Sequence, residues 1–348
     1  MRRQPVNKKT LLNASVRALV LIAAVAVGVL GVGGGSEAGA APRMKKIPVI
    51  LDLDIGDDID DTWALGMALR SPEIDLKLVV GDQGKPLYRA KLIAKFLEAA
   101  GRSKIPVGIG METAQKGEGG QAEWVKDYDL DRYPGKVHKD GVQAIIDTIM
   151  RSREPVTLLA IGPLPNIAAA LEREPRIAQR ARFVGMHGSV RIGYGGSKTP
   201  HAEFNVKQDV RSAQRSLSAP WEMTITPLDT CGLIDLQGER YRKVRDSRDP
   251  IAAAIVENYR LWSAKQTGAG QQDPFQSRSS TLFDTVAVYL VFSTELLKME
   301  RLPITVNDEG FTVINPTGKP MNVATEWKDL DAFRDLLVER LTNGRTRR

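Results

Sequence analysis

The chain has 348 residues, of which 42% are hydrophobic and 26% are charged. These proportions are ordinary for a folded globular protein, and the length allows a large core without disulfide or metal crosslinks. The formal net charge is +7. Much of this charge comes from basic residues at the two ends, which are Arg2, Arg3, Lys8, Lys9, Arg345, Arg347 and Arg348. Between the ends both signs are interspersed and no basic run alternates with aromatic residues, so the composition argues against nucleic-acid binding.

Residues 1–40 have the organisation of a secretory signal peptide. Basic residues extend to Arg17, an apolar run covers about 18–32, and small residues follow up to Ala40. An A-x-A site before Ala41 predicts cleavage and export, to the periplasm or out of the cell, with no membrane association afterwards. The alternative is an uncleaved membrane anchor, which the short, glycine-containing apolar run favours less.

Cys231 is the one cysteine of the sequence, so no intramolecular disulfide can form. The residues around it, 228–232, show no familiar catalytic pattern. We expect Cys231 to be a small core residue.

Short apolar runs alternate with segments of helical periodicity along the rest of the chain. We expect strands at 47–51, 76–80, 105–108, 156–161 and 181–186, and helices at 62–69, 88–100, 141–152 and 165–171. This alternation predicts an α/β fold with a mainly parallel central sheet and helices on both faces. No linker divides residues 45–341, which we interpret as one domain followed by a basic disordered tail at 342–348. A polar, glycine-rich stretch at 112–134 is expected to be a long loop, and such loops are often functional.

Six carboxylates follow the first expected strand within residues 52–61. In such sheets ligands bind at the carboxyl ends of the strands. Like charges crowded so closely are unfavourable unless a cation neutralises them, and an oxygen-only set favours Ca²⁺ or Mg²⁺ over zinc. A solvated acidic loop is the simpler alternative. An EF-hand is excluded, because its twelfth position would be Trp63 and no helix precedes the loop.

A phosphatase interpretation starts from Asp52 and Asp54. In an Asp-x-Asp phosphatase these residues would act as nucleophile and acid beside Mg²⁺. Such an enzyme also needs a phosphate-binding Ser or Thr and a Lys at later strand ends, and the sequence offers no convincing set.

The acidic cluster resembles the Asp-x-Asp-x-Gly-x-Asp-Asp signature of nucleoside hydrolases, in a longer variant with two more residues before the final Asp pair. Further segments that resemble the family follow in the right order at 79–82, 158–168, 202–205 and 283–284. The resemblance covers nearly all of 46–341 and implies the Rossmann-like nucleoside hydrolase fold. It also implies hydrolysis of the N-glycosidic bond of ribonucleosides or related N-ribosides to ribose and free base.

The resemblance implies a calcium ion held by Asp54, Asp61, Asp284 and the backbone carbonyl of Ile161. Asp52 would support the metal-binding loop. The calcium ion would gather a water molecule and the ribose 2′- and 3′-hydroxyls. The ligand would be a small-molecule nucleoside or N-riboside, and members of this family are commonly homo-oligomers.

The general base implied by the resemblance is Asp60, the first residue of the final Asp pair. Asp58 is the rival, because the two-residue insertion leaves the local alignment ambiguous. The base takes a proton from the attacking water, while acidic groups around the sugar stabilise an oxocarbenium-like transition state.

Glu203 and Asn205 resemble the pair that holds the ribose hydroxyls in this family. Asp82 stands where many relatives have Asn, and we expect it to accept a hydrogen bond from a ribose hydroxyl; the alternative is a turn residue after Gly81. His201 is the histidine best placed for contacting substrate, with an ordinary surface-loop histidine as the alternative.

Two positions depart from the family pattern. Many relatives have a His immediately before the last metal-binding Asp, where it helps the base to leave, and here that residue is Phe283. Ser197 stands, by count, where relatives carry an Asn that faces the ribose. These departures leave open an unusual base, a non-nucleoside N-riboside, or a non-catalytic protein that binds ribose or nucleosides. On the helix before 267–280, Tyr259 and Trp262 either stack on the leaving base, as aromatics do in relatives, or pack in the core.

Overall fold

The computed structural model describes residues 45–343 except 115–116 and 268–271. The predicted signal peptide, residues 1–40, lies outside the described residues, as do residues 344–348 of the predicted tail. The described residues belong to one compact unit. No helix among them is long and apolar enough to cross a membrane.

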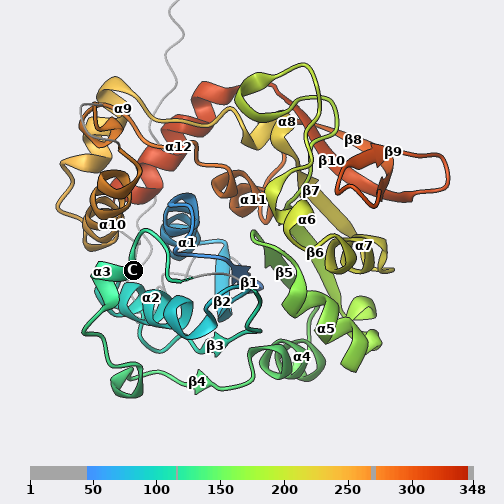
Figure 1. The fold of residues 1–348 in the computed structure, drawn as a ribbon, viewed down its shortest axis with the longest axis horizontal. Coiled ribbons are helices and arrows are strands. Elements are labelled where there is room, and N and C mark those ends of the chain that lie inside the picture. The colour runs from blue at the N-terminus through green and yellow to red at the C-terminus, as the bar shows by residue number, and fades with distance from the viewer. Residues whose placement is uncertain (1–44, 115–116, 268–271, 344–348) are drawn as a thin grey trace, which may run out of the picture. The chain divides into compact units, whose positions relative to one another are not determined.

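A ten-stranded sheet forms the centre of this unit (Figure 1), in the order β4-β3-β2-β1-β5-β6-β7-β10-β8-β9. The strands are β1 (Ile47–Leu53), β2 (Ile74–Gly81), β3 (Val107–Ile109), β4 (Val137–His138), β5 (Val156–Ala160), β6 (Ala181–Met186), β7 (Met223–Thr226), β8 (Leu297–Val306), β9 (Thr312–Ile314) and β10 (Lys319–Trp327). In this spatial order, every neighbouring pair between β4 at one edge and β10 is parallel. The two pairs that β8 makes, with β10 and with β9, are antiparallel. The predicted mainly parallel sheet is confirmed, with an antiparallel edge added to it.

Most of the helices lie in the connections between strands, and the last one follows the last strand. The helices are α1 (Asp60–Arg70), α2 (Pro86–Ala99), α3 (Ala122–Val125), α4 (Gly141–Arg151), α5 (Pro165–Arg173), α6 (Phe204–Gln208), α7 (Val210–Ser218), α8 (Leu228–Cys231), α9 (Gly238–Arg245), α10 (Pro250–Gln266), α11 (Asp284–Leu290) and α12 (Leu330–Thr342). The helices and strands predicted before residue 187 are all present, with their ends shifted by a few residues.

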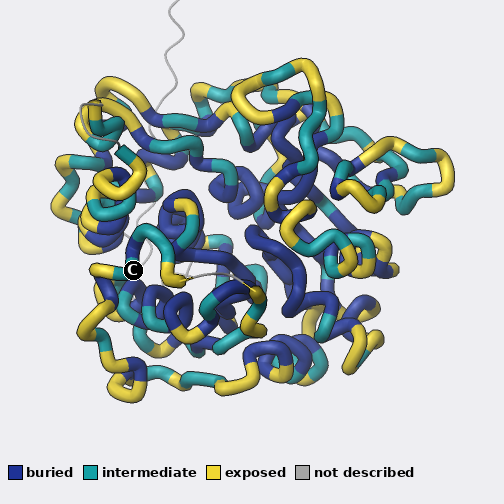
Figure 2. Tube along the Cα trace, in the orientation of Figure 1, coloured by how far each residue is buried: buried dark blue, intermediate teal, exposed yellow. Residues whose placement is uncertain are grey.

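Helices cover both faces of the sheet, because successive side chains of a strand point to opposite sides. In β1, Val49 and Leu51 enter the core that is shared with α1, α2 and α10 to α12. Ile50, between them, enters the core that is shared with α4, α5 and α7. Figure 2 shows the central strands buried and the exposed residues in the outer loops and helix surfaces. The predicted coverage of both faces is confirmed.

The stretch predicted as a long loop, 112–134, contains short helical turns, which are α3 and a 3-10 turn at Leu130–Arg132. Gln121 ties this stretch to the core. Its Nε2 donates to Thr62 Oγ1 at 2.8 Å and to Asn258 Oδ1 at 2.9 Å. The loop therefore lies against α1 and α10.

Two smaller predictions concern the core and the C-terminal end. Cys231 is buried in the last turn of α8, as expected for a small core residue. The tail was predicted to start at 342, and α12 continues to Thr342, the first residue of that range. Leu341 is fully buried and holds the last turn of the helix against the core.

Candidate active site and metal site

Residues 54–59 connect β1 to α1 in a tight and mostly buried turn. Gly56 has a φ of 112°, and a Cβ atom at this position would lie 2.6 Å from the ring of Tyr88. Both observations require glycine here. The hydroxyl of Tyr88 donates to the carbonyl of Gly56 at 3.2 Å and holds the turn against α2.

Arg89 of α2 is a buried cation directly behind this turn. Its guanidinium donates to the carbonyl oxygens of Asp54, Ile55 at 2.9 Å and Gln83 at 2.8 Å. It also donates to the carboxylate of Asp57 at 3.0 Å. Arg89 therefore fixes the backbone of the acidic turn and places a positive charge beside its carboxylates.

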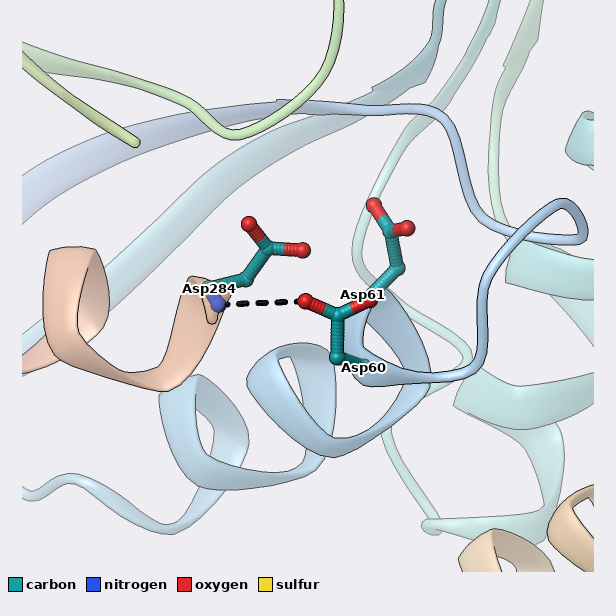
Figure 3. A group of neighbouring side chains, drawn as sticks. All are labelled: Asp60, Asp61 and Asp284. Atoms are coloured by element: carbon teal, nitrogen blue, oxygen red, sulfur yellow. Dashed lines mark hydrogen bonds between the residues drawn. The ribbon is translucent and has the colours of Figure 1, made fainter. Parts of the chain in front are cut away.

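Three carboxylates from two helices meet at the centre of the site (Figure 3). Asp60 and Asp61 lie in the first turn of α1, and Asp284 is the first residue of α11. One oxygen from each lies within 4.8 Å of the others, and the backbone N–H of Asp284 donates to Asp60 Oδ2 at 3.3 Å. Burial raises the pKa of all three carboxyls, and neighbouring carboxylates raise it further. This carboxylate trio joins the predicted base, Asp60, to two predicted metal ligands.

The trio has the chemistry of a divalent-cation site. All of its donors are oxygens, which suit hard cations. Asp61 Oδ1 is buried and has no hydrogen-bond partner among the described residues. Asp54, another predicted ligand, lines the same cavity, and burial raises its pKa to about 7 although Arg89 opposes the shift. The residues fit a metal ion, because a cation would relieve the repulsion between them.

A cavity of about 660 Å³ lies beside the trio. The described part of its wall carries the carboxylates of Asp54, Asp57, Asp58, Asp60, Asp61, Glu203 and Asp284, and the aromatic rings of Tyr194, Phe204, Trp262 and Phe283. The rest of that wall is made by Gly119, Gly120, Ile161, Met186, Asn205 and Gln266. The ends of β1, β5 and β6 thus reach one cavity together with the first turns of α1 and α11. The volume suits a small-molecule ligand.

The predicted ribose-holding pair, Glu203 and Asn205, lies at the start of α6 and lines this cavity. The carboxylate of Glu203 accepts the backbone N–H of Asn205 at 2.7 Å and of Gly188 at 2.9 Å. Burial raises the pKa of Glu203 to about 7, and these backbone donors oppose the rise. Asn205 Nδ2 donates to the carbonyl oxygens of Ile161 at 3.0 Å and Met186 at 3.1 Å. The Ile161 carbonyl keeps a second lone pair that a cation could use.

Asp52 and Asp82 are fully buried and do not belong to the described cavity wall. Asp52 Oδ2 accepts a hydrogen bond from Asn166 Nδ2 at 2.8 Å, an arrangement that suits the supporting role predicted for Asp52. Burial raises the pKa of the Asp82 carboxyl, and the neighbouring carboxylate of Asp52 raises it further. Asp82 lies behind the wall, and its contact with a ribose hydroxyl stays a prediction.

His201 and Ser197 also lie outside the described cavity wall. His201 Nδ1 accepts the backbone N–H of Tyr194 at 3.1 Å, so the histidine supports a residue that does line the cavity. Ser197 Oγ accepts the backbone N–H of Thr199 at 3.1 Å within the same loop. The structure brings neither side chain to the carboxylate trio.

The two aromatic residues predicted on α10 have different surroundings. Tyr259 is buried, and its ring packs edge-on against Trp63 with the ring centroids 6.3 Å apart. Trp262 lines the cavity, and its Nε1 donates to the carbonyl of Asp57 at 2.9 Å. The core interpretation therefore applies to Tyr259, and the cavity interpretation applies to Trp262.

Several residues of the site were not predicted. The sequence did carry a signal for Arg89, since a charged residue among the apolar positions of α2 is unusual in a buried face. Asn166 lies in the segment that resembles the nucleoside hydrolases, but its contact with Asp52 spans 114 residues of sequence. Tyr194 and Phe204 carried no distinct signal, because their place in the wall depends on how two loops pack.

Comparison with known proteins identifies the family of this chain. The family model described as inosine-uridine preferring nucleoside hydrolase matches residues 49–335, which include every carboxylate of the cavity wall. The chain belongs to the nucleoside hydrolase family. This nucleoside hydrolase is therefore a hydrolase that acts on N-glycosyl compounds, which disfavours the phosphatase interpretation.

Relatives of this nucleoside hydrolase match over most of their length. It is 28% identical to the pyrimidine-specific ribonucleoside hydrolase of Citrobacter koseri, over 85% of this chain and 98% of that protein. It is 30% identical to the inosine-uridine preferring nucleoside hydrolase of Leishmania major, over 84% and 96% respectively. The solved structure of a plant nucleoside hydrolase superposes with a TM-score of 0.69 at 21% identity, over 85% of this chain and 99% of that one. The structure of the purine-preferring ribonucleoside hydrolase of Gardnerella vaginalis superposes with a TM-score of 0.67 at 22% identity. This match covers 85% of this chain and 98% of that one.

The role of Arg89 leads to a first prediction. Arg89→Met leaves the acidic turn without its buried donors, so we expect the free energy of unfolding to fall by about 3 kcal/mol, as when one partner of a buried ion pair is removed. Divalent-cation affinity should fall as well. Lys91→Met removes the same charge from the same helix, away from the turn, and should change both quantities little. Chemical denaturation and cation titration measure them, and equal effects in the two variants would contradict the role of Arg89.

The raised pKa values predict how the metal-free protein responds to pH. Asp54 and Glu203, each with a pKa raised to about 7 by burial, bind protons more tightly in the folded state than in the unfolded state. The stability of the chelated protein should therefore rise as the pH falls from about 8 to about 6, by roughly 1 kcal/mol per group. His187, whose pKa burial lowers to about 4, opposes this trend. Its contribution is smaller, under roughly 1 kcal/mol at pH 6, because the unfolded histidine is only partly protonated there.

Thermal melts with a chelator and with a divalent cation, across this pH interval, test the prediction. Metal ligands must be deprotonated, so the stabilisation that the cation adds should weaken as the pH falls. A chelated protein that loses stability between pH 8 and pH 6 would contradict the directions of these pKa shifts.

Proposed function

We propose that this enzyme hydrolyses the N-glycosidic bond of ribonucleosides or related N-ribosides, giving ribose and the free base, with Ca²⁺ as cofactor and Asp60 as general base. One observation carries the proposal: the oxygen-only trio of Asp60, Asp61 and Asp284 is buried beside a cavity that also offers aromatic rings. Carboxylates suit a cation and a sugar that develops positive charge, and aromatic rings suit a planar base.

Asp54, Asp61, Asp284 and the carbonyl of Ile161 would hold the calcium ion. These oxygens come from the end of β1, the starts of α1 and α11 and the end of β5, and all four residues line the cavity. When bound, a calcium ion supplies positive charge that acidifies a neighbouring water molecule and attracts the ribose hydroxyls. Fixed oxygen donors from four different elements favour a large hard cation over zinc.

Asp60 is the better placed of the two candidate bases. It is buried, and its pKa is raised by burial and by the charge of Asp58, so it accepts a proton readily once ionised. Desolvation raises the pKa of Asp58 as well, but this residue is exposed, and its Oδ1 already accepts the backbone N–H of Ile59 at 2.7 Å, which opposes the rise. Asp60 Oδ2 accepts the backbone N–H of Asp284 at 3.3 Å, which orients the carboxylate within the trio.

The remaining polar groups orient the sugar. The carboxylate of Glu203 and the amide of Asn205 face the same cavity as the trio. Backbone donors hold both oxygens of Glu203, so its position is set before a ligand arrives. The negative charge around the ribose stabilises positive charge that develops at the anomeric carbon as the C–N bond breaks.

Asp60→Asn tests the base directly. We expect kcat for ribose release to fall by about 10² to 10⁴, the usual contribution of a general base, with the melting temperature and calcium affinity nearly retained. Asp58→Asn is the matched control, since it removes the same charge two residues away and should keep most of the activity. The opposite ranking of the two variants would make Asp58 the base.

The activity itself is tested by ribose release from purine and pyrimidine nucleosides, with calcium and after chelation. Calcium-dependent release is expected. If calorimetry instead showed binding of intact nucleoside with no ribose released, the protein would be a nucleoside binder that has lost catalysis.

We further propose that the chain is exported and cleaved before Ala41, on the basis of the charged, apolar and small-residue order of residues 1–40. The protein recovered from a secretion-competent host should have Ala41 as its first residue. Ala40→Gln, which puts a large polar side chain at the cleavage site, should block processing. A wild-type protein that keeps residues 1–40 and stays with the membrane would support the anchor alternative.

A further inference from the structure

The charges around the cavity are unbalanced. The described residues of the wall contribute seven carboxylates, from Asp54, Asp57, Asp58, Asp60, Asp61, Glu203 and Asp284, and no lysine, arginine or histidine. Arg89 contacts Asp57 from behind the turn, and a divalent cation would offset two more charges. The cavity therefore stays negative around its ligand even with the metal bound, and it attracts positive charge.

The aromatic part of the wall adds to this preference. Tyr194 and Phe204 are large side chains that are 39% and 46% exposed, although both line the cavity. Phe283 lies against Tyr194, with ring centroids 6.1 Å apart and an interplanar angle of 84°. Aromatic faces attract cations as well as planar rings. A flat cationic ligand can stack on the aromatic rings and is attracted by the carboxylates.

The aromatic side chains of the wall offer little help to a neutral leaving base. When the bond to a neutral base breaks, the electron pair leaves with the ring nitrogen, which becomes an anion unless an acid protonates the base. Phe283, next to Asp284, has no proton to give. The hydroxyl of Tyr194 accepts the backbone N–H of Phe204 at 2.9 Å, and burial raises the pKa of that hydroxyl. Neither ring is therefore a good general acid.

We propose that this enzyme prefers ribosides whose aromatic base carries a fixed positive charge at or conjugated with the glycosidic nitrogen, such as N-ribosylpyridinium and 7-methylpurine ribosides. This inference rests on the proposed function. The C–N electron pair moves to the cationic ring, which leaves as a neutral molecule. Water adds its oxygen to the anomeric carbon, and Asp60 takes the released proton. The step yields ribose, a neutral base and one proton, and needs no leaving-group acid.

Two substrate comparisons test the preference. Guanosine and 7-methylguanosine differ by one methyl group and its charge, and nicotinamide riboside supplies a pyridinium base beside inosine and uridine. Each rate is divided by that of the uncatalysed reaction, because cationic ribosides are intrinsically more reactive. As a measure of binding alone, the 1-methylnicotinamide cation should inhibit at least about tenfold more strongly than neutral nicotinamide, a difference of about 1.4 kcal/mol.

Phe283→His and Phe283→Leu separate the missing acid from the aromatic contact. The histidine supplies a proton donor, so the kcat/KM ratio of 7-methylguanosine to guanosine should fall by at least about tenfold, since general acids contribute about 10² or more. The leucine removes the ring without adding a donor, so it should weaken binding of both substrates and lower the ratio much less than the histidine does.

The outcomes distinguish this inference from the function on which it rests. If ribose is released faster from the cationic riboside of each pair, after each rate is divided by the uncatalysed rate, the inference is supported. Equal or faster release from neutral nucleosides, or equal inhibition by the charged and neutral nicotinamides, overturns it and leaves the proposed hydrolase in place. No ribose from any substrate, with calcium bound and the protein folded, overturns the proposed function itself.

Discussion

Buried carboxylates repel one another, and this nucleoside hydrolase places Asp54, Asp60, Asp61 and Asp284 around a single cavity. Removing that many charges from water is unfavourable, and burial accordingly raises the pKa of every one of them. The folded state can accept this arrangement in two ways, by protonation or by a bound cation. Because the oxygens are fixed by separate elements, the second way leaves them arranged for catalysis.

The surrounding protein reduces this cost with groups of opposite polarity. The N-terminal end of α1 carries Asp60 and Asp61 in its first turn, where the helix dipole favours negative charge. Arg89 donates to the backbone carbonyls of the turn from the opposite side. Gly56, which has no side chain, lets this turn pack closely against α2. The acidic turn is therefore held by its backbone, so that its carboxylates remain directed toward the cavity.

The cavity wall links this electrostatic arrangement to substrate choice. Its carboxylates favour positive charge on the sugar, which every N-glycoside develops as its bond breaks. They equally favour positive charge on the base. Relatives named for different base preferences match most of this chain at 28% and 30% identity, so family membership alone does not specify the base. In our proposal the base lies near the aromatic residues of the wall, which are Tyr194, Phe204, Trp262 and Phe283.

The parallel sheet, the helices on its two faces and the acidic strand end could be predicted from the sequence, because apolar periodicity and the order of Asp52 to Asp61 are local properties of the chain. Which side chains meet depends on the packing of distant elements. Asp60 and Asp284 are 224 positions apart, and their contact depends on how α1 packs against α11. The contacts of Arg89, and the burial of Asp82 behind the wall, likewise follow from three-dimensional packing, which no local pattern contains.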